Sequence, residues 1–269
     1  MDSLILADSH CHLEGLDLTF YEGSLTRAVA VARENQVRYL LNVATRLDAF
    51  PGLISLLSQD EFIYGAIGVH PSEVVDQEPS VDDLTRLFDH PRMVAVGETG
   101  LDYHYQFVNH ETQRERFRRH IQAARLVKKP LIIHTREASQ DVLRILKEEK
   151  AEEVGGVLHC FTENWAVAEA ALAMGFYLSF SGILTFKNAE AIRAVAKQAP
   201  FDRLLIETDS PYLAPVPQRG KSNEPAYLKY IAACLAEIRG VTLAEIAKQT
   251  TKNFQRLFLL KTSRTEAHC

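Results

Sequence analysis

Short apolar segments, each the length of a β-strand, recur along the chain at fairly even intervals. They are Ser3–Ala7, Tyr39–Val43, Phe62–Ile67, Met93–Val96, Leu131–Ile133, Gly156–Leu158, Phe176–Leu178 and Leu204–Ile206. Between them, apolar residues lie three to four positions apart, as in Thr112–Val127 and Glu137–Lys147. This spacing is typical of amphipathic helices. We therefore predict alternating strands and helices, followed by helices over Pro225–Ile238 and, after the N-cap Thr242, over Leu243–Leu260.

The continuous apolar character of these strands predicts a parallel sheet that helices cover on the outside. A chain of 269 residues with this many strand-helix units favours a closed (β/α)₈ TIM barrel, which commonly takes about 250 residues, over an open doubly wound sheet. No G-x-G-x-x-G sequence follows the first segment, so a dinucleotide-binding fold is not indicated. Without a linker or a low-complexity stretch, we expect residues 1–269 to form one domain.

The composition is that of an ordinary globular protein, with 46% hydrophobic and 24% charged residues. A net charge of −5 argues against general electrostatic coating of long nucleic acid, although it permits a local phosphate site. Four cysteines without CxxC spacing read as reduced thiols: Cys11, Cys160, Cys234 and Cys269. Neither a secretion signal nor a membrane-spanning run is present, so we expect a cytoplasmic protein without membrane contact.

Polar residues follow most of the predicted strands, where a barrel of this class carries its active groups. They include His10, His12, Thr45, His70, Glu98, His134, His159, Ser179 and Asp209. Side chains alternate along a strand, so His10 and His12 share a face while Cys11 points the other way. We interpret the two histidines as a chelating pair. By the same alternation, Cys160 is expected to point away from His159.

Three carboxylates complete the candidate site. Glu98 follows the fourth strand and has two oxygens that can bridge two cations, although a buried acid paired with arginine is the alternative. Asp209 is a candidate metal ligand and also a general base for an attacking water. Glu207 lies two residues earlier on the same face; a third metal ion and a hydrogen bond to a ligand histidine are both open for it. Glu98 and Asp209 are the predicted catalytic residues.

Imidazole and carboxylate donors without thiolate suit divalent zinc, magnesium or manganese. Two such ions, or three if Glu207 binds one, would lower the pKa of a bound water and neutralise charge on the attacked group. We therefore predict a hydrolase. Its predicted metal ligands are His10, His12, Glu98, His134, His159 and Asp209, with Glu207 as a further candidate.

Five motifs occur together in this order: DSHCHL from Asp8, GETGLDY from Gly97, IHTR from Ile133, LHCFT from Leu158 and ETDSPYLAP from Glu207. They resemble the TatD family of metal-dependent deoxyribonucleases, in particular its YcfH-like branch, over nearly the whole chain. The resemblance implies an amidohydrolase-type barrel with one metal on His10, His12 and Asp209. A second metal would lie on His134 and His159, with Glu98 between the two ions.

The resemblance also implies DNA as the substrate, cleaved at single strands or ends, often from the 3′ end. It marks the loop Gly220–Pro225, which ends in the family's Asn-Glu-Pro sequence. We expect Lys221 and Asn223 of this loop, with His70 and Arg136, to bind the substrate near its phosphate. A solvated turn is the alternative for Lys221.

Two aromatic residues beside the ligand motifs, Tyr103 and Tyr212, either stack on a base or pack at the top of the barrel. Two other functions stay open. The same metal arrangement serves carboxylic ester or amide hydrolysis, including aminoacyl esters. A non-enzymatic barrel that uses metal for stability is less favoured, because structural zinc sites are usually closed by thiolates. A monomer is compatible with the sequence, which leaves the oligomeric state undetermined.

Overall fold

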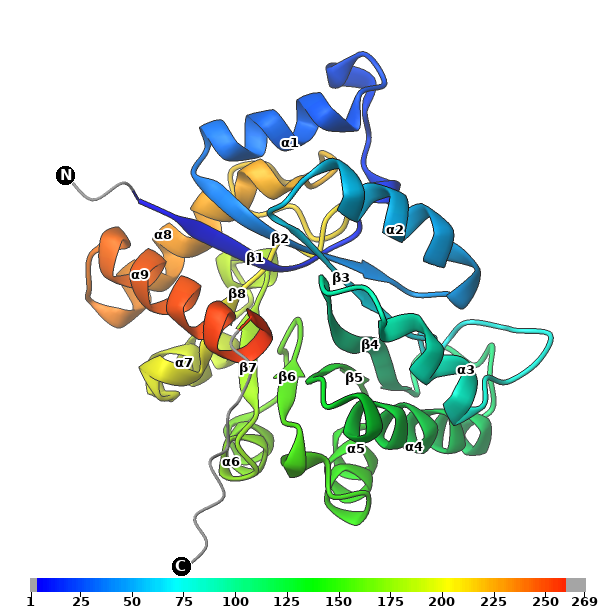
Figure 1. Cartoon of the computed structure of the whole chain (residues 1–269). Coiled ribbons are helices and arrows are strands. Elements are labelled where there is room, and N and C mark those ends of the chain that lie inside the picture. The colour runs from blue at the N-terminus through cyan, green and yellow to red at the C-terminus, as the bar shows by residue number, and fades with distance from the viewer. Residues whose placement is uncertain (1–3, 260–269) are drawn as a thin grey trace, which may run out of the picture.

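The apolar segments form a ring of parallel strands in the computed structural model, which describes residues 4–259 (Figure 1). The strands are β1 (Leu6–Cys11), β2 (Val37–Ala44), β3 (Ile63–Ile67), β4 (Met93–Asp102), β5 (Leu131–Arg136), β6 (Gly156–Leu158), β7 (Tyr177–Phe180) and β8 (Leu204–Ile206). Each pairs in parallel with the next along the chain. After β8 the chain returns to β1, where Asp209 N donates to His10 O at 2.9 Å and His12 N donates to Ser210 O at 2.8 Å. The predicted (β/α)₈ barrel is confirmed.

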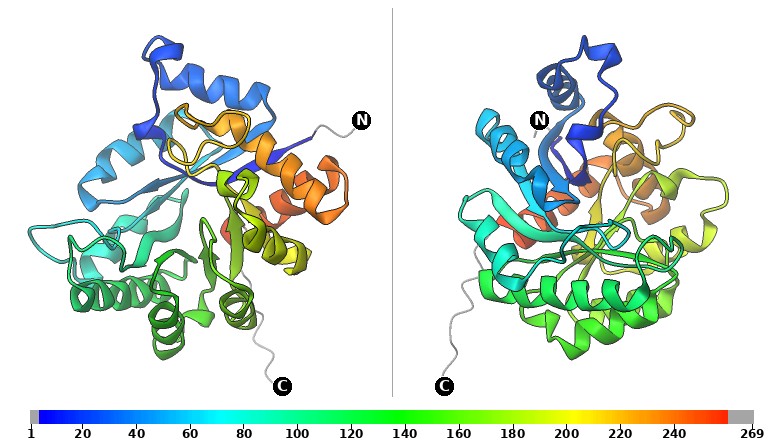
Figure 2. Two further views of the ribbon diagram at one scale, coloured as in Figure 1. Left: turned by 180° about the vertical axis from the view of Figure 1, so that it is seen from behind. Right: turned by 90° about the vertical axis from the view of Figure 1, so that its right-hand side faces the viewer.

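Helices surround this barrel on the outside, as the two further views show (Figure 2). They are α1 (Leu25–Glu34), α2 (Phe50–Gln59), α3 (Val81–Thr85), α4 (His110–Val127), α5 (Ser139–Glu148), α6 (Trp165–Ala173), α7 (Glu190–Gln198), α8 (Leu228–Arg239) and α9 (Leu243–Phe254). Within residues 4–259, no helix combines the length and the apolar character needed to cross a membrane. The predicted strand start at Ser3, the helix end at Leu260 and Cys269 lie outside the described residues.

The helix boundaries differ from the predicted ones where side chains cap the first turn. The α4 helix begins at His110 because the side chain of Asn109 accepts a hydrogen bond from Thr112 N. The segment predicted as a helix from Pro225 begins with a 3₁₀ turn, Pro225–Tyr227, before α8. In α9 the predicted cap is confirmed, because Thr242 forms a capping box with Glu245.

The inside of the barrel is filled by small and branched side chains from alternate strand positions. This buried cluster consists of Ala7, Leu41, Val43, Ala66, Val94, Ala95, Ile132, Val157, Tyr177, Leu205, Phe254 and Phe258. Phe254 ends α9, which contacts β1 and β8, and Phe258 lies in the π-helix Gln255–Leu259 that follows. These two aromatic rings plug the end of the barrel where the strands begin. The opposite end, where the strands finish, is left for the polar residues.

Candidate metal centre

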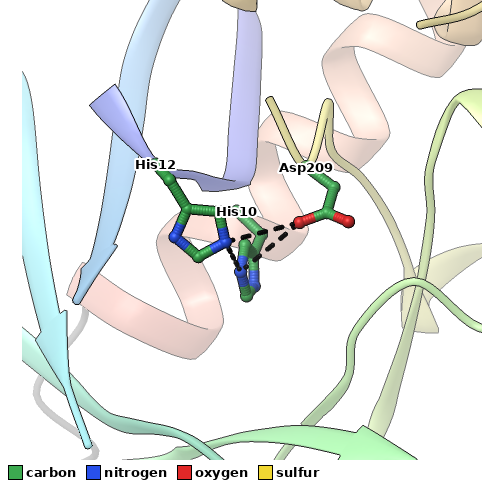
Figure 3. Close-up of side chains that lie close together, drawn as sticks. All are labelled: His10, His12 and Asp209. Atoms are coloured by element: carbon green, nitrogen blue, oxygen red, sulfur yellow. Dashed lines mark hydrogen bonds and ion pairs between the residues drawn. The ribbon is translucent and has the colours of Figure 1, made fainter. Parts of the chain in front are cut away.

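His10 and His12 converge at the end of β1 with Asp209, which lies on the loop after β8 (Figure 3). The two Nε2 atoms are 3.2 Å apart. Asp209 Oδ1 lies 3.8 Å from His10 Nε2 and 3.5 Å from His12 Nε2. The His12 Nδ1–H donates to Val43 O at 2.7 Å, which leaves the Nε2 lone pair facing this group. Cys11 Sγ points the other way and lies 3.4 Å from Leu41 O, as the alternation along the strand predicts.

Glu98, on β4, divides its two oxygens between two sets of imidazoles. Its Oε2 atom lies 3.4 Å from His10 Nε2 and 3.9 Å from His12 Nε2. Its Oε1 atom lies 3.0 Å from His134 Nδ1 and 2.8 Å from His159 Nε2. This is the arrangement of a carboxylate that joins two groups of ligands, each served by one oxygen.

The surrounding imidazoles keep the two central carboxylates ionised. Burial raises the pKa of Glu98, but the charges of His159 and His70 and hydrogen bonds from other histidines outweigh it, and the pKa lies well below its usual range. His70 Nε2 is 3.3 Å from Glu98 Oε1. The pKa of Asp209 is also lowered, because the hydrogen bond with His12 and the nearby histidine charges outweigh burial. Both groups are therefore anionic donors.

Asp102, at the end of β4, contacts His134 on the ring nitrogen that faces away from Glu98. Its Oδ2 atom lies 3.0 Å from His134 Nε2, and its Oδ1 atom accepts the backbone N–H groups of His104 and Tyr105 at 3.0 and 3.1 Å. A proton on His134 Nε2 leaves the Nδ1 lone pair free to face Glu98. Asp102 is not among the residues predicted for the site. The signal was present, because Glu98 and Asp102 are four residues apart and alternate positions of a strand share a face.

Glu207 is fully buried beside His159. Its Oε1 atom accepts the Cys160 N–H at 2.7 Å and lies 3.3 Å from His159 Nδ1. Its Oε2 atom and His10 Nδ1 are buried without a hydrogen-bond partner among the described residues. Donor atoms of His10, His159 and Glu207 all lie within 4.8 Å of one another. One of the two alternatives for Glu207, a hydrogen bond to a histidine of the site, is therefore present, and its Oε2 atom is still available.

The donor atoms fit divalent metal ions. Within residues 4–259, four overlapping groups have donor atoms within 4.8 Å of one another: His10, His12 and Asp209; His10, His159 and Glu207; His70, Asp102 and His134; and Glu98, His134 and His159. All are imidazoles and carboxylates, the set that suits borderline or hard cations. A buried polar atom without a hydrogen-bond partner destabilises the fold unless a ligand contacts it. The unpartnered His10 Nδ1 and Glu207 Oε2 atoms therefore favour a metal ion beside them.

Two of the predicted substrate-binding residues, Arg136 and Lys221, are exposed cations with different partners. Arg136, at the end of β5, is exposed and places its guanidinium 4.9 Å from the centre of the Tyr105 ring. Lys221 is exposed and donates from Nζ to Gln218 Oε1 at 2.9 Å. Arg219, a further cation two residues before Lys221, places its guanidinium 3.9 Å from the Phe186 ring centre. Of these cations, Arg136 is two residues from a histidine of the centre.

Asn223 is buried and holds the loop after β8. Its amide nitrogen donates to the carbonyl oxygens of Thr208 at 2.7 Å and Tyr212 at 2.6 Å, on either side of Asp209. Tyr212 itself is 62% exposed, with its ring centre 6.0 Å from that of His12. Tyr103 instead packs inward: its ring stacks on that of His110 at 3.8 Å, and its hydroxyl donates to Asp141.

The family model described as TatD related DNase matches residues 7–259. This chain belongs to the TatD family. It is 47% identical to the metal-dependent hydrolase YcfH of Escherichia coli K12, over 98% of this chain and 99% of that protein. It is 33% identical to the 3′-5′ ssDNA/RNA exonuclease TatD of Erwinia tasmaniensis, over 91% of this chain and 98% of that protein.

Among solved structures, this TatD-family chain is similar to the TatD homologue YJJV from Escherichia coli K12. The TM-score is 0.86 at 26% identity, and the match covers 95% of this chain and 98% of that one. The resemblance to the YcfH-like branch is confirmed, and the chain is a metal-dependent hydrolase.

Proposed function

We propose that this hydrolase cleaves DNA phosphodiester bonds, acting on single strands or ends as a 3′-5′ exonuclease. The observation that carries the proposal is the position of Glu98, with one oxygen directed at His10 and His12 and the other at His134 and His159. Paired cations at such a carboxylate suit a charged phosphodiester, whose attacking and leaving oxygens both need stabilising. The related Erwinia tasmaniensis protein is named for action on single-stranded DNA and RNA.

In this proposal His10, His12 and Asp209 would hold one zinc, magnesium or manganese ion, His134 and His159 would hold a second, and Glu98 would contribute a carboxylate oxygen to each group. When bound, these ions would lower the pKa of a water molecule and neutralise charge on the phosphate. A third ion at Glu207 is the extension that its unpartnered Oε2 atom supports. A cytoplasmic location stays a prediction.

Asp209 is the residue best placed to hold the proton of the attacking water. Its side chain is 12% exposed, against 4% for Glu98, so it borders the opening of the site while Glu98 lies deeper. Both Glu98 oxygens are also engaged by imidazoles, whereas Asp209 contacts His10 and His12 through Oδ1. Its lowered pKa keeps the carboxylate in the ionised form that a general base requires.

On the substrate side, His70 borders Glu98, and Arg136 and Lys221 supply positive charge for the phosphate. Asn223 acts through position, because its amide fixes the carbonyl groups on either side of Asp209. These local contacts matter because the whole chain carries a net charge of −5 and offers no general attraction to DNA.

The test is cleavage of single-stranded and duplex oligonucleotides, of DNA and of RNA, labelled at either end and supplied with zinc, magnesium or manganese. We expect metal-dependent shortening of single-stranded DNA from its 3′ end, abolished in Glu98→Gln while circular dichroism shows the fold retained. Acyl-ester and amide substrates are assayed in parallel. Hydrolysis of these substrates without any cleavage of oligonucleotides would overturn the proposal.

A further inference from the structure

Two large aromatic side chains are exposed on the loop between β4 and α4. Tyr105 is 41% exposed and Phe107 is 68% exposed. Their rings are nearly parallel, with an interplanar angle of 9° and centres 5.5 Å apart. The Arg136 guanidinium lies 4.9 Å from the centre of the Tyr105 ring. We call Arg136, Tyr105 and Phe107 the aromatic platform; large exposed apolar groups of this kind commonly mark an interaction site.

The platform is tied directly to the metal centre. Asp102 contacts His134 through Oδ2, and through Oδ1 it accepts the backbone N–H groups of His104 and Tyr105. On the exposed side, His104 Nδ1 lies 2.8 Å from Glu137 Oε1, which joins the loop after β4 to the loop after β5. The backbone that carries Tyr105 is therefore fixed by the same carboxylate that orients a histidine of the site.

The platform differs from the other aromatic residue of this loop. Tyr103 is held by its hydroxyl and covered by His110, so its ring packs against the protein. Phe107 is mostly exposed, and its side chain has no hydrogen-bonding group that could direct it inward. An exposed flat ring beside an arginine is the combination that holds unpaired bases, because every base has a face that can stack.

We propose that the aromatic platform binds an unpaired base of the substrate strand by stacking on Phe107, while Arg136 contacts the neighbouring phosphate. This inference rests on the proposed nuclease function and narrows it to strands with accessible bases. A paired base stays stacked within its duplex and cannot reach the ring without being flipped out. Stacking contacts the face of a base and not its hydrogen-bonding edge, so it does not distinguish one base from another. We therefore expect a preference for single strands without a preference for sequence.

The experiment compares Phe107→Ala with the wild-type protein on two single-stranded oligonucleotides of equal length and charge. One carries ordinary bases, and the other carries abasic residues at its 3′ end. Leu126→Ala is the matched control, because Leu126 is 67% exposed but lies sixteen residues further along α4 than His110, about 24 Å away. Both variants change exposed side chains, so the fold should be retained, and thermal unfolding checks this.

On the oligonucleotide with bases, Phe107→Ala is expected to raise KM about 5-fold to 140-fold with kcat little changed. This range corresponds to about 1 to 3 kcal/mol for one stacked base, at 1.4 kcal/mol per factor of ten. On the abasic oligonucleotide, wild-type protein and Phe107→Ala should have the same KM. Arg136→Ala should raise KM on both oligonucleotides. It should also reduce the slope of the logarithm of the binding constant against the logarithm of salt concentration by about 1, as expected for the loss of one phosphate contact.

An unchanged KM for Phe107→Ala on the oligonucleotide with bases would overturn the platform while leaving the nuclease function standing. An equal rise in KM on both oligonucleotides would also overturn it, because the ring would then act without a base. Wild-type protein that cleaves neither oligonucleotide but hydrolyses acyl esters would overturn the nuclease function and the platform together.

Discussion

Replacement of Asp102 by asparagine tests whether the proton position on His134 controls metal binding. Asparagine has the same shape, and its oxygen can still accept the backbone N–H of Tyr105. Its NH₂ group, however, would donate to His134 Nε2, where the aspartate now accepts a hydrogen bond. The imidazole would then carry its proton on Nδ1, the atom that lies 3.0 Å from Glu98 Oε1. That nitrogen would no longer offer a lone pair to a metal ion.

The expected loss of metal affinity is moderate because Asp102 contacts a predicted metal ligand, His134, and is not itself a predicted ligand. Substitutions of carboxylates that orient a ligand histidine typically cost about 10-fold to 100-fold in metal affinity or activity, or about 1.4 to 2.7 kcal/mol. Only the ion held by His134 and His159 should be affected. The donors on the other side, His10 and His12, do not contact Asp102 in any hydrogen bond among the described residues.

The assay is calorimetric titration of the metal-free protein with Zn²⁺ or Mn²⁺, together with oligonucleotide cleavage at increasing metal concentration. Asp102→Asn should weaken one of two binding steps and should recover part of its activity when metal is in excess. Asp141→Asn is the matched control, since this carboxylate accepts the Tyr103 hydroxyl and contacts no histidine of the site. Two binding steps of wild-type affinity in Asp102→Asn would refute the reasoning.

Two further predictions concern stability. Burial lowers the pKa of His120 to about 4, whereas a histidine of the unfolded chain has a pKa near 6.5. Between these values the unfolded chain binds a proton that the folded protein does not bind, so acid favours unfolding. His120 should by itself lower the free energy of unfolding by about 3 kcal/mol between pH 6.5 and pH 4, so urea unfolding of His120→Gln should show a shallower fall over this range than the wild-type protein; equal slopes would contradict this. Gly100→Ala should lower Tm more than Gly175→Ala, because both have positive φ but only the first places Cβ 2.0 Å from His134 O. Equal melting temperatures would refute it.

The sequence was sufficient for the ligands that depend on strand alternation. His10, Cys11 and His12 follow one another on β1, and their opposite directions need no knowledge of neighbouring strands. The same holds for Glu98 on β4 and His134 on β5, because the C-terminal parts of the strands of a parallel barrel meet at one rim. Strand position alone therefore predicts that Glu98 lies at the centre of the site, where its oxygens approach the imidazoles of His10 and His134.

The remaining contacts depend on distances between segments that the sequence does not encode locally. His134 presents its Nδ1 atom to Glu98 because Asp102 accepts a hydrogen bond from its Nε2 atom. This contact joins two neighbouring strands and is not visible in the local sequence around His134. Asn223 matched a family loop, but its role in holding the carbonyl groups beside Asp209 depends on how that loop folds back. Solvent exposure of Phe107 is likewise a property of the folded loop.

The meeting of the first and last strands at the metal centre has a consequence for protein synthesis. His10 and His12 leave the ribosome early, whereas Asp209 follows after about three quarters of the chain. A growing polypeptide therefore holds only fragments of the donor set until β8 has been made and has closed against β1. For a hydrolase whose proposed substrate is nucleic acid, the complete donor set therefore exists only once β8 has closed the ring against β1.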